Sequence, residues 1–507
     1  MNTPRDDQVV FWRTMANGLA AGKTVMTCLA EARSAVTGSD LESVARTLIA
    51  SVDAGKTVSY ALSEHPGTFD QRIVEAMRSG EMGGIMEVAA SIIAEALEKG
   101  DLDMLEPGRL PFASDAIGYV SSLLEQAFAG HASDIHLDPT ESRRGLVRMR
   151  VDGVLHQVDP PAEGLFPMVI DYIKVMGAMD VREKSIPQQG RCDMDRDRVH
   201  RRVHISTIPA IRGERVVLRI LPGGKEDMVL GLDKLGLAGQ DLEKVRGLCN
   251  LPSGMVIVTG PAGNGKTTTL YSMLKEMDQH TECIITIEDP VEFAFEGMGQ
   301  IQTRPQAGLT YAKVMRSVLY QDPDVIMVGE LLDLETLQLG VLIANTGHLL
   351  LSTMHANTAV GVIRRLTDMG LETYSINASL AAVIAQRLIR VLCDKCKQPK
   401  PAPAPHSLPP EAAEFLSKRP EARFHGPVGC EDCRGTGYRG RTGIHEILVM
   451  NDEIRRILAA SADMPAIQQA ACRAGMKTLL ESGLEKAAAG VTSVEEVLRV
   501  VPTGLGT

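Results

Sequence analysis

The segment GPAGNGKT, Gly260 to Thr267, constrains the fold of this 507-residue chain more than any other feature. It fits the pattern G-x-x-x-x-G-K-[ST] and lies between a predicted strand and a predicted helix, the context that the pattern needs. Backbone N–H groups of such a loop surround phosphate oxygens, and the dipole of the following helix favours their charge. The segment therefore predicts a nucleotide-binding loop rather than a chance glycine-rich turn, with Lys266 on the β- and γ-phosphates and Thr267 on Mg²⁺. The residues expected around the nucleotide are Gly260, Pro261, Ala262, Gly263, Asn264, Gly265, Lys266, Thr267 and Thr268.

Four short apolar runs lie in this part of the chain, and helical stretches alternate with them. They are MVIVTG (Met255 to Gly260), CIITIED (Cys283 to Asp289), VIMVGE (Val325 to Glu330) and HLLLSTMH (His348 to His355). Their lengths suit strands that are buried on both faces, which indicates a parallel, doubly wound sheet. Such sheets bind ligands where their strands end, and each run ends in polar or glycine residues.

Acidic residues stand at the ends of two of these runs. Glu330 is placed to orient Mg²⁺ or its water. Glu288, Asp289 and Glu292 lie where a carboxylate would position or activate the attacking water. A single strand-end acid more often caps the next turn or helix. Beside a nucleotide-binding loop, the catalytic role is favoured.

Two histidines, His348 and His355, bracket the last apolar run. Each is either a hydrogen-bonded structural residue or a sensor that reports the γ-phosphate to a neighbouring subunit. The sequence leaves both roles open.

Four of the nine cysteines form two C-x-x-C pairs, Cys393 with Cys396 and Cys430 with Cys433. Two such knuckles can complete a tetrahedral thiolate site for Zn²⁺. The proline-rich insert at 399–410 accounts for the long gap between the pairs. A redox pair or a disulfide is the alternative. The remaining cysteines, at positions 28, 192, 249, 283 and 472, are assigned no role.

Charge is distributed unevenly along the chain. The net charge is −11, which argues against a bulk electrostatic grip on nucleic acid. From Arg143 to Arg219, however, 15 Lys and Arg stand against 10 Asp and Glu. A local arginine cluster in an acidic protein indicates a phosphate ligand. No apolar run reaches the roughly 18–20 residues of a membrane span, and the N-terminus has no apolar signal core, so a cytosolic location is expected.

Changes of pattern predict a multidomain chain of five parts. A helical region with breaks at Gly55, His65–Gly67 and Gly80 is followed by short alternating β-like runs, with a helix near Phe166 to Met179 and a hinge at Pro222–Gly224. The expected parts are an all-α bundle with its linker (1–105), an α+β domain (113–223), an α/β P-loop (RecA-like) ATPase domain (228–392), a tetracysteine zinc-binding element (393–445) and C-terminal helices (446–507).

Residues 115–500 resemble the secretion ATPases that drive type II secretion and type IV pilus assembly. The resemblance lies in a series of motifs that occur in the family's order. They are ASDIHLDP (132–139), RMRVDG (148–153), IPQQGR (186–191), GERVVLRIL (213–221), ITIEDPVEF (285–293), DPDVIMVGE (322–330) and TGHLLLSTMHANTA (346–359). The tetracysteine element is typical of the assembly and export branch of that family.

The resemblance implies a hexameric, Mg²⁺-dependent ATPase with nucleotide between the P-loop domain and the arginine-rich domain before it. It makes Glu288 the catalytic glutamate, Glu330 the Walker B acid and His355 a member of the His box. The arginines that it implies as phosphate or interface contacts are Arg148, Arg150, Arg191, Arg215 and Arg316.

Two positions depart from the family pattern. Tyr320 occupies the position of the second arginine in the family segment L-R-x-x-L-R-Q-D-P-D. Leu332 occupies the position of the arginine in G-E-I-R-D. An arginine at the transferring phosphoryl group is worth about 10³–10⁵ in rate. If Tyr320 occupies the position of such an arginine, the resemblance implies either that turnover is low or that a neighbouring arginine performs the same role.

Residues 8–100 resemble a different protein of the same machines, the cytoplasmic helical domain of the inner-membrane platform protein. The segments FWRTMANGLAAG (11–22), DAGKTVSYALSEHPGTFD (53–70) and MRSGEMGG (77–84) carry this resemblance. It implies that the domain docks the hexamer to the platform or replaces one of its contacts. An unrelated helical bundle is the alternative.

Together these features predict a cytoplasmic motor ATPase, peripheral to the inner membrane, that uses ATP, Mg²⁺ and Zn²⁺. Its expected partners are further copies of itself in a homohexamer, the platform protein and an adaptor of the same machine, with membrane association only through partners. A weakly hydrolysing regulatory or scaffold subunit is the alternative that Tyr320 and Leu332 leave open. A nucleic-acid motor is disfavoured by the charge and by the lack of a basic, aromatic-rich strip.

Overall fold

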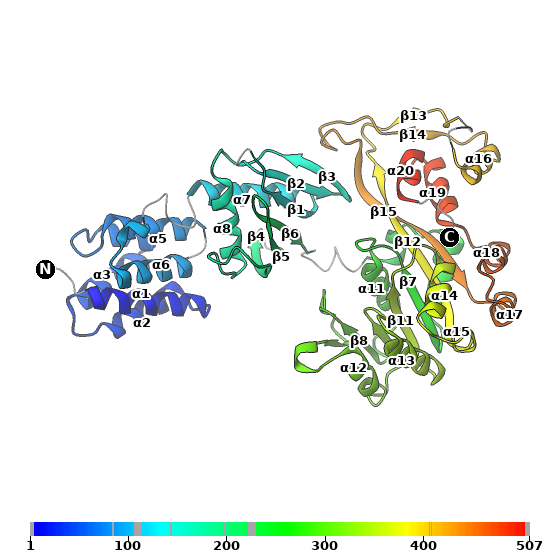
Figure 1. The fold of residues 1–507 in the computed structure, drawn as a ribbon, viewed down its shortest axis with the longest axis horizontal. Helices are drawn as coiled ribbons and strands as arrows, with labels where there is room; N and C mark the ends of the chain where they lie inside the picture. The colour runs from blue at the N-terminus through cyan, green and yellow to red at the C-terminus, as the bar shows by residue number, and fades with distance from the viewer. Residues whose placement is uncertain are drawn as a thin grey trace. The chain divides into compact units, whose positions relative to one another are not determined.

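The computed structural model describes residues 5–83, 86–105, 114–141, 144–196, 199–221, 230–404, 406 and 408–501. The chain forms two compact units, Met1–Gly223 and Gly224–Thr507 (Figure 1). The predicted hinge at Pro222–Gly224 lies outside the described residues.

The first unit begins with a helical bundle, as predicted. Its elements are α1 (Arg5–Ala20), α2 (Val25–Ala35), α3 (Asp40–Asp53), α4 (Val58–Ser63), α5 (Gln71–Gly83), α6 (Met86–Lys99) and the short η1 (Leu102–Leu105). Trp12 is fully buried and packs edge-on against Phe11 and Phe69. The predicted break at Gly80 is wrong, because α5 continues through it. A glycine costs a helix only about 1 kcal/mol, and α5 buries an apolar face that includes Ile73 and Met77.

The second half of this unit is the predicted α+β region. Its helices are α7 (Ser114–Ala129) and α8 (Phe166–Met176). Its strands are β1 (Ala132–Asp138), β2 (Leu146–Val151), β3 (Val154–Val158), β4 (Gln188–Arg196), β5 (Val199–Ala210) and β6 (Gly213–Ile220), in the antiparallel order β3-β2-β1-β6-β5-β4. The helix expected to reach Met179 ends at Met176, since Gly177 caps it and Ala178 turns the chain at φ 53°.

The second unit is built on a seven-stranded sheet in the order β15-β12-β7-β11-β10-β8-β9. Figure 1 labels β15, β12, β7, β11 and β8 of this sheet. All four predicted runs are strands of this sheet. They are β7 (Gly254–Thr259), β8 (Ile284–Glu288), β10 (Val325–Val328) and β11 (Leu349–Met354), each buried along most of its length and parallel to its neighbours.

The sheet is mixed rather than purely parallel, which corrects the prediction. The parallel strands β9 (Gly299–Gln302) and β12 (Leu380–Leu392) extend it on its two sides, and β15 (Tyr438–Val449) pairs with β12 in antiparallel fashion. These strands were not expected, because β12 has no clean alternation and β15 begins with the polar residues of YRGRTG.

Helices cover both faces of this sheet. One apolar core contains residues of η2 (Leu232–Leu235), α10 (Gly239–Cys249) and α11 (Lys266–Glu276). The other contains residues of α12 (Tyr311–Val318), α13 (Leu334–Asn345), α14 (Ala359–Asp368), α15 (Thr373–Ser379), α17 (Asp452–Ala460) and α18 (Met464–Arg473). The unit is therefore a three-layer α/β sandwich.

The C-terminal part contains β13 (Gln398–Lys400), α16 (Pro410–Ser417), β14 (Phe424–Gly426), α19 (Leu479–Ala488) and α20 (Val494–Val500). The helices expected from residue 446 onward begin at Asp452, because Glu446 belongs to β15. Its buried carboxylate accepts the backbone N–H of Ala359 (2.7 Å) and of Leu479 (3.4 Å). One side chain thus caps the first turns of both α14 and α19.

Across the part of the chain that the structure describes, no helix combines the length and apolar character needed to cross a bilayer.

Candidate active site

The loop after β7 has the geometry of a phosphate cradle. β7 ends at Thr259 and α11 begins at Lys266. Between them Gly260, Gly263 and Gly265 have positive φ angles of 150°, 72° and 78°, a backbone region that favours glycine. The Lys266 ammonium donates to the carbonyl oxygens of Gly260 (3.0 Å) and Pro261 (3.3 Å), and burial lowers its pKa. A half-buried lysine folded over its own loop is placed to contact an anion held there.

Glu330 and His355 meet at the same edge of the sheet. They follow β10 and β11, which are parallel neighbours of each other, and β11 is also the neighbour of β7. Nε2 of His355 lies 3.1 Å from Oε1 of Glu330. The Glu330 charge also acts on Lys266 and partly offsets the lowering of that lysine's pKa. The structure therefore brings Lys266, Glu330 and His355 together, as the strand-end argument predicts.

Glu288 is the last residue of β8 and is buried, and its carboxylate is held from three directions. It accepts hydrogen bonds from the Tyr271 hydroxyl, the Thr286 hydroxyl (2.6 Å) and the Gln300 amide (3.2 Å). Burial and then the Glu288 charge raise the pKa of Glu292. Of these two glutamates, Glu288 is the one with a fixed and fully hydrogen-bonded carboxylate.

His348 lies at the opposite edge from His355, because it precedes β11 rather than following it. Its Nδ1 lies 3.0 Å from the Thr346 hydroxyl and 3.1 Å from the Ile343 carbonyl oxygen. Its backbone carbonyl accepts from Gly254 at the start of β7. The structural role that the sequence left open for His348 agrees with this geometry.

The arginines predicted in the first unit lie on its sheet and pair with aspartates of β1. Asp138 contacts Arg148 (2.7 Å) and Arg215 (2.9 Å). Asp134 contacts Arg150 (3.8 Å) and Arg219 (3.0 Å). In each case one carboxylate faces two guanidinium groups. Arg191, on β4, is exposed.

Arg316 and the two departures from the family pattern lie on the surface of the second unit. Arg316, on α12, pairs with Glu335 at the start of α13 (2.6 Å). Tyr320 is 87% exposed and Leu332 is 58% exposed. Neither replacement fills a place in the core.

The four paired cysteines form one cluster. The sulfur–sulfur distances are 3.8 Å for Cys393–Cys430, 3.8 Å for Cys396–Cys433 and 3.7 Å for Cys430–Cys433. A tetrahedral Zn²⁺ with Zn–S bonds of about 2.3 Å places its sulfurs about 3.8 Å apart. Backbone N–H groups of Gly429, Cys430 and Gly437 point at the sulfurs of Cys396 and Cys433, at 3.1–3.3 Å. The donor set and its spacing fit Zn²⁺, and not a disulfide, whose sulfurs lie about 2.0 Å apart.

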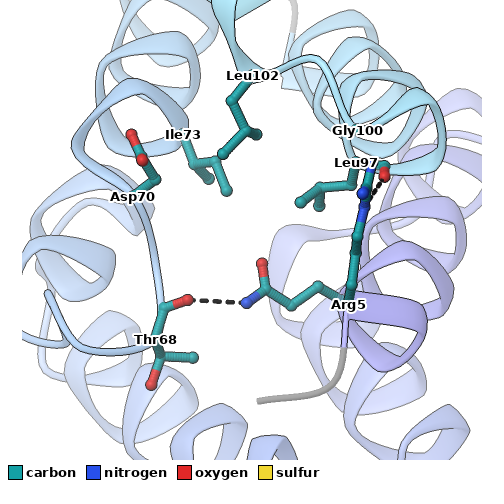
Figure 2. Close-up of a pocket in the computed structure, with 8 residues that line it drawn as sticks. Arg5, Thr68, Asp70, Ile73, Leu97, Gly100 and Leu102 are labelled. Carbon is teal, nitrogen blue, oxygen red and sulfur yellow. Dashed lines mark hydrogen bonds between the residues drawn. The ribbon is translucent and has the colours of Figure 1, made fainter. Parts of the chain in front are cut away.

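A separate pocket of about 240 Å³ lies within the helical bundle of the first unit (Figure 2). Arg5 donates to the carbonyl oxygen of Leu97, and Gln8 donates to that of Thr68 (2.8 Å). Its one acid, Asp70, is paired with Arg72 (2.8 Å). The pocket holds no paired nucleophile and base, so the candidate active site remains the edge of the second unit's sheet.

Sequence reasoning missed the residues that support these groups. Tyr271, Thr286 and Gln300 come from three different elements around Glu288, and no local pattern marks them. Gln386, on β12, could have been found from the sequence, because it is a polar residue that interrupts the apolar run LAAVIAQRLIRVL (380–392). The interruption falls where this buried strand approaches the sheet edge that carries the candidate site.

A glycine-rich loop between a buried parallel strand and a helix, with acids at the ends of two further strands of the same sheet, defines a P-loop nucleoside triphosphatase. A family model described as type II/IV secretion system protein matches residues 114–499. The chain belongs to this family, and with it is an ATP hydrolase.

Curated relatives and solved structures agree with this assignment. The chain is 42% identical over 387 residues to type II secretion system protein E of Pectobacterium carotovorum, covering 76% of this chain and 75% of the relative. It is 39% identical over 464 residues to type II secretion system protein HxcR of Pseudomonas aeruginosa, covering 88% and 93%.

Two solved structures share the fold. The Legionella pneumophila ATPase DotB has a TM-score of 0.56 at 19% identity, covering 75% of this chain and 94% of DotB. The pilus retraction motor PilT, solved with bound ADP, has a TM-score of 0.50 at 24% identity, covering 75% and 95%.

Proposed function

We propose that the chain is a motor ATPase that powers type II secretion or the assembly of a related pilus. The observation that carries the proposal is the meeting of Lys266, Glu330 and His355 at one sheet edge. Relatives named type II secretion system protein E align over about three quarters of their length, which supports a role in type II secretion. The chain acts in the cytoplasm, at the inner membrane.

In the proposed reaction, the phosphates of ATP are bound by the Lys266 ammonium and by backbone N–H groups of the loop from Gly260 to Thr267, to which Pro261 contributes none. The Thr267 hydroxyl and Glu330 are the groups that would hold Mg²⁺, which supplies charge neutralisation between the phosphates. Glu288 accepts a proton from the attacking water or orients it. His355 holds Glu330 and is placed to respond to the terminal phosphate. Arg148, Arg150, Arg191, Arg215 and Arg316 are the candidates to stabilise charge on that phosphate, within one subunit or across a subunit boundary.

Lys266→Ala is the direct test of the site. It removes charge-assisted contacts worth about 1.5–3 kcal/mol each, so we expect affinity for ADP to fall by about 10–100-fold and ATP turnover to be lost. Titration calorimetry with ADP and Mg²⁺ and steady-state phosphate release measure the two effects. Lys418→Ala, which removes an exposed lysine paired with Glu414, is the matched control and leaves both ADP affinity and turnover unchanged.

Unchanged ADP binding in Lys266→Ala would place the nucleotide elsewhere. If the assembled wild-type oligomer binds ADP but does not hydrolyse ATP, the result would favour the regulatory or scaffold role.

We further propose that the chain works as a homohexamer and meets an inner-membrane platform protein and an adaptor of the same machine. The aspartate-held arginines on the first unit's sheet support a contact with an anion there, since four guanidinium groups share two carboxylates. Nucleic acid is not a proposed partner. DNA is expected to leave turnover unchanged.

The helices of residues 1–105 are proposed to dock the motor to the platform. They precede the matched family region, which starts at residue 114. Deleting residues 1–105 is expected to abolish binding to membranes that contain the platform protein, measured by co-flotation, while turnover and cooperative unfolding of the remainder persist. Full membrane binding by the truncated chain would refute this role.

The tetracysteine cluster is proposed to hold one structural Zn²⁺. The closed set of four sulfurs and the N–H groups aimed at them support a structural rather than a catalytic site, because no ligand position is left open.

A further inference from the structure

Gln386 connects β12 to the nucleotide-binding loop through its side chain. It is 3% exposed, and both ends of its amide are used. Nε2 donates to the carbonyl oxygen of Asn264 in the loop (2.6 Å), and Oε1 accepts from the Thr269 hydroxyl on α11 (2.7 Å). One amide therefore bridges the loop and the helix that follows it.

The backbone around Gln386 also contacts the loop. The N–H of Leu388 donates to Oδ1 of Asn264 (2.9 Å). A Cβ on Gly260 would collide with the carbonyl oxygen of Gln386, so the first glycine of the loop packs directly on β12. Asn264 is thus held at two atoms, its backbone oxygen and its side-chain oxygen, by residues 386–388.

Arg387 holds this segment from its other side. Its guanidinium donates to Oδ1 of Asn357 (3.1 Å), two residues after His355. Arg387 is 9% exposed, and burial lowers its pKa. Successive side chains of a strand point to opposite faces, so Gln386 and Arg387 fasten the loop after β7 and the loop after β11 to one strand.

We propose that Gln386 is a positioning residue for nucleotide binding: it sets the conformation of the loop at Asn264 so that the loop's N–H groups converge on the phosphates. The assignment rests on the nucleotide-binding role proposed above for residues 260–267. A cradle of backbone N–H groups binds an anion well only when those groups are already oriented, since reorienting them would reduce the affinity. The neighbouring strand provides that orientation.

Gln386→Met tests the role, because methionine keeps the length of the side chain and removes both hydrogen bonds. Losing a buried hydrogen bond that orders the site is expected to weaken ADP binding by about tenfold. Titration calorimetry with ADP and Mg²⁺ measures this, and KM for ATP rises with little change in kcat.

Thr269→Val is the matched control. It removes the Thr269 donor but leaves the bond from Gln386 to Asn264, so thermal stability falls while ADP affinity changes little. Equal losses of ADP affinity in Gln386→Met and Thr269→Val would show a merely structural role and overturn the proposal. So would unchanged affinity in Gln386→Met.

Asn264→Ala removes the second bond that holds this residue, from the Leu388 N–H to Oδ1, and keeps the test open if Gln386→Met fails to fold. We expect weaker ADP binding, and a combined effect in the double variant that departs from the sum of the two, because both variants release the same loop residue. Additive effects would contradict a joint hold of the two bonds on Asn264. Lys266→Ala separates a failure of the positioning role from a failure of the proposed nucleotide site. If Lys266→Ala leaves ADP binding intact, the proposed nucleotide site is wrong. If Lys266→Ala loses ADP binding while Gln386→Met and Asn264→Ala keep it, only the positioning role is overturned.

Discussion

Glu288→Gln is expected to lower ATP turnover by about 10²–10⁴-fold, the usual contribution of a general base. The amide has nearly the same size as the carboxylate but is not a base. Its one oxygen can still accept from Thr286 and Gln300, and its NH₂ group can donate to the Tyr271 hydroxyl oxygen, so the fold and nucleotide binding should persist. Phosphate release and ADP titration on the same preparation separate the loss of chemistry from a loss of binding.

Two further acids serve as controls for this prediction. Glu292→Gln tests the rival carboxylate four residues on, whose pKa is raised by burial and by Glu288, and it should reduce turnover far less. Glu276→Gln removes an acid of α11 that pairs with Arg246 on the surface and should have no effect. A large loss in Glu292→Gln with a small one in Glu288→Gln would reverse the assignment.

Cys433→Ser is expected to remove the bound zinc and to lower the thermal unfolding temperature markedly. Metal binding at structural thiolate sites in small zinc domains is worth about 10–16 kcal/mol near neutral pH. Cys433 receives N–H groups from Cys430 and Gly437, so its loss breaks both the donor set and its support. Zinc content by mass spectrometry and unfolding by calorimetry give the two readouts.

Cys472→Ser is the matched control for the zinc prediction. Cys472 is exposed and lies outside the cluster, so its replacement should leave zinc content and stability unchanged. Retention of stoichiometric zinc by Cys433→Ser would contradict a four-sulfur site. An intact wild-type protein that contains no zinc but forms disulfides between these cysteines would support the redox alternative.

Much of the second unit's fold could be predicted because its information is local. The run MVIVTG and the loop after it specify a buried strand, a turn rich in glycine and a helix start within a short stretch of chain. Strand-end positions then place Glu330 and His355 at one edge, since parallel strands end together. The spacing of the two C-x-x-C pairs likewise predicted that the four cysteines lie together.

The rest depended on contacts between distant segments. The strand β12 was missed because Gln386 and Arg387 interrupt its apolar pattern, and those polar residues are explained only by Asn264 and Asn357 elsewhere in the chain. Two of the donors to Glu288, Tyr271 and Gln300, come from α11 and β9, so no local spacing in the sequence could show them. Gly80 failed as a helix break because burial along α5 outweighs its low helix propensity.

The shared cap at Glu446 has a mechanical consequence. α14 begins just after the loop that carries His355, and α19 belongs to the C-terminal helices, yet both first turns depend on the two oxygens of one buried carboxylate. Separating them would leave half of that carboxylate, or an N–H group, without a partner away from water, which costs about 1–3 kcal/mol. Glu446 is therefore a direct side-chain bridge between the start of α14, next to the His355 loop, and the start of α19 among the C-terminal helices.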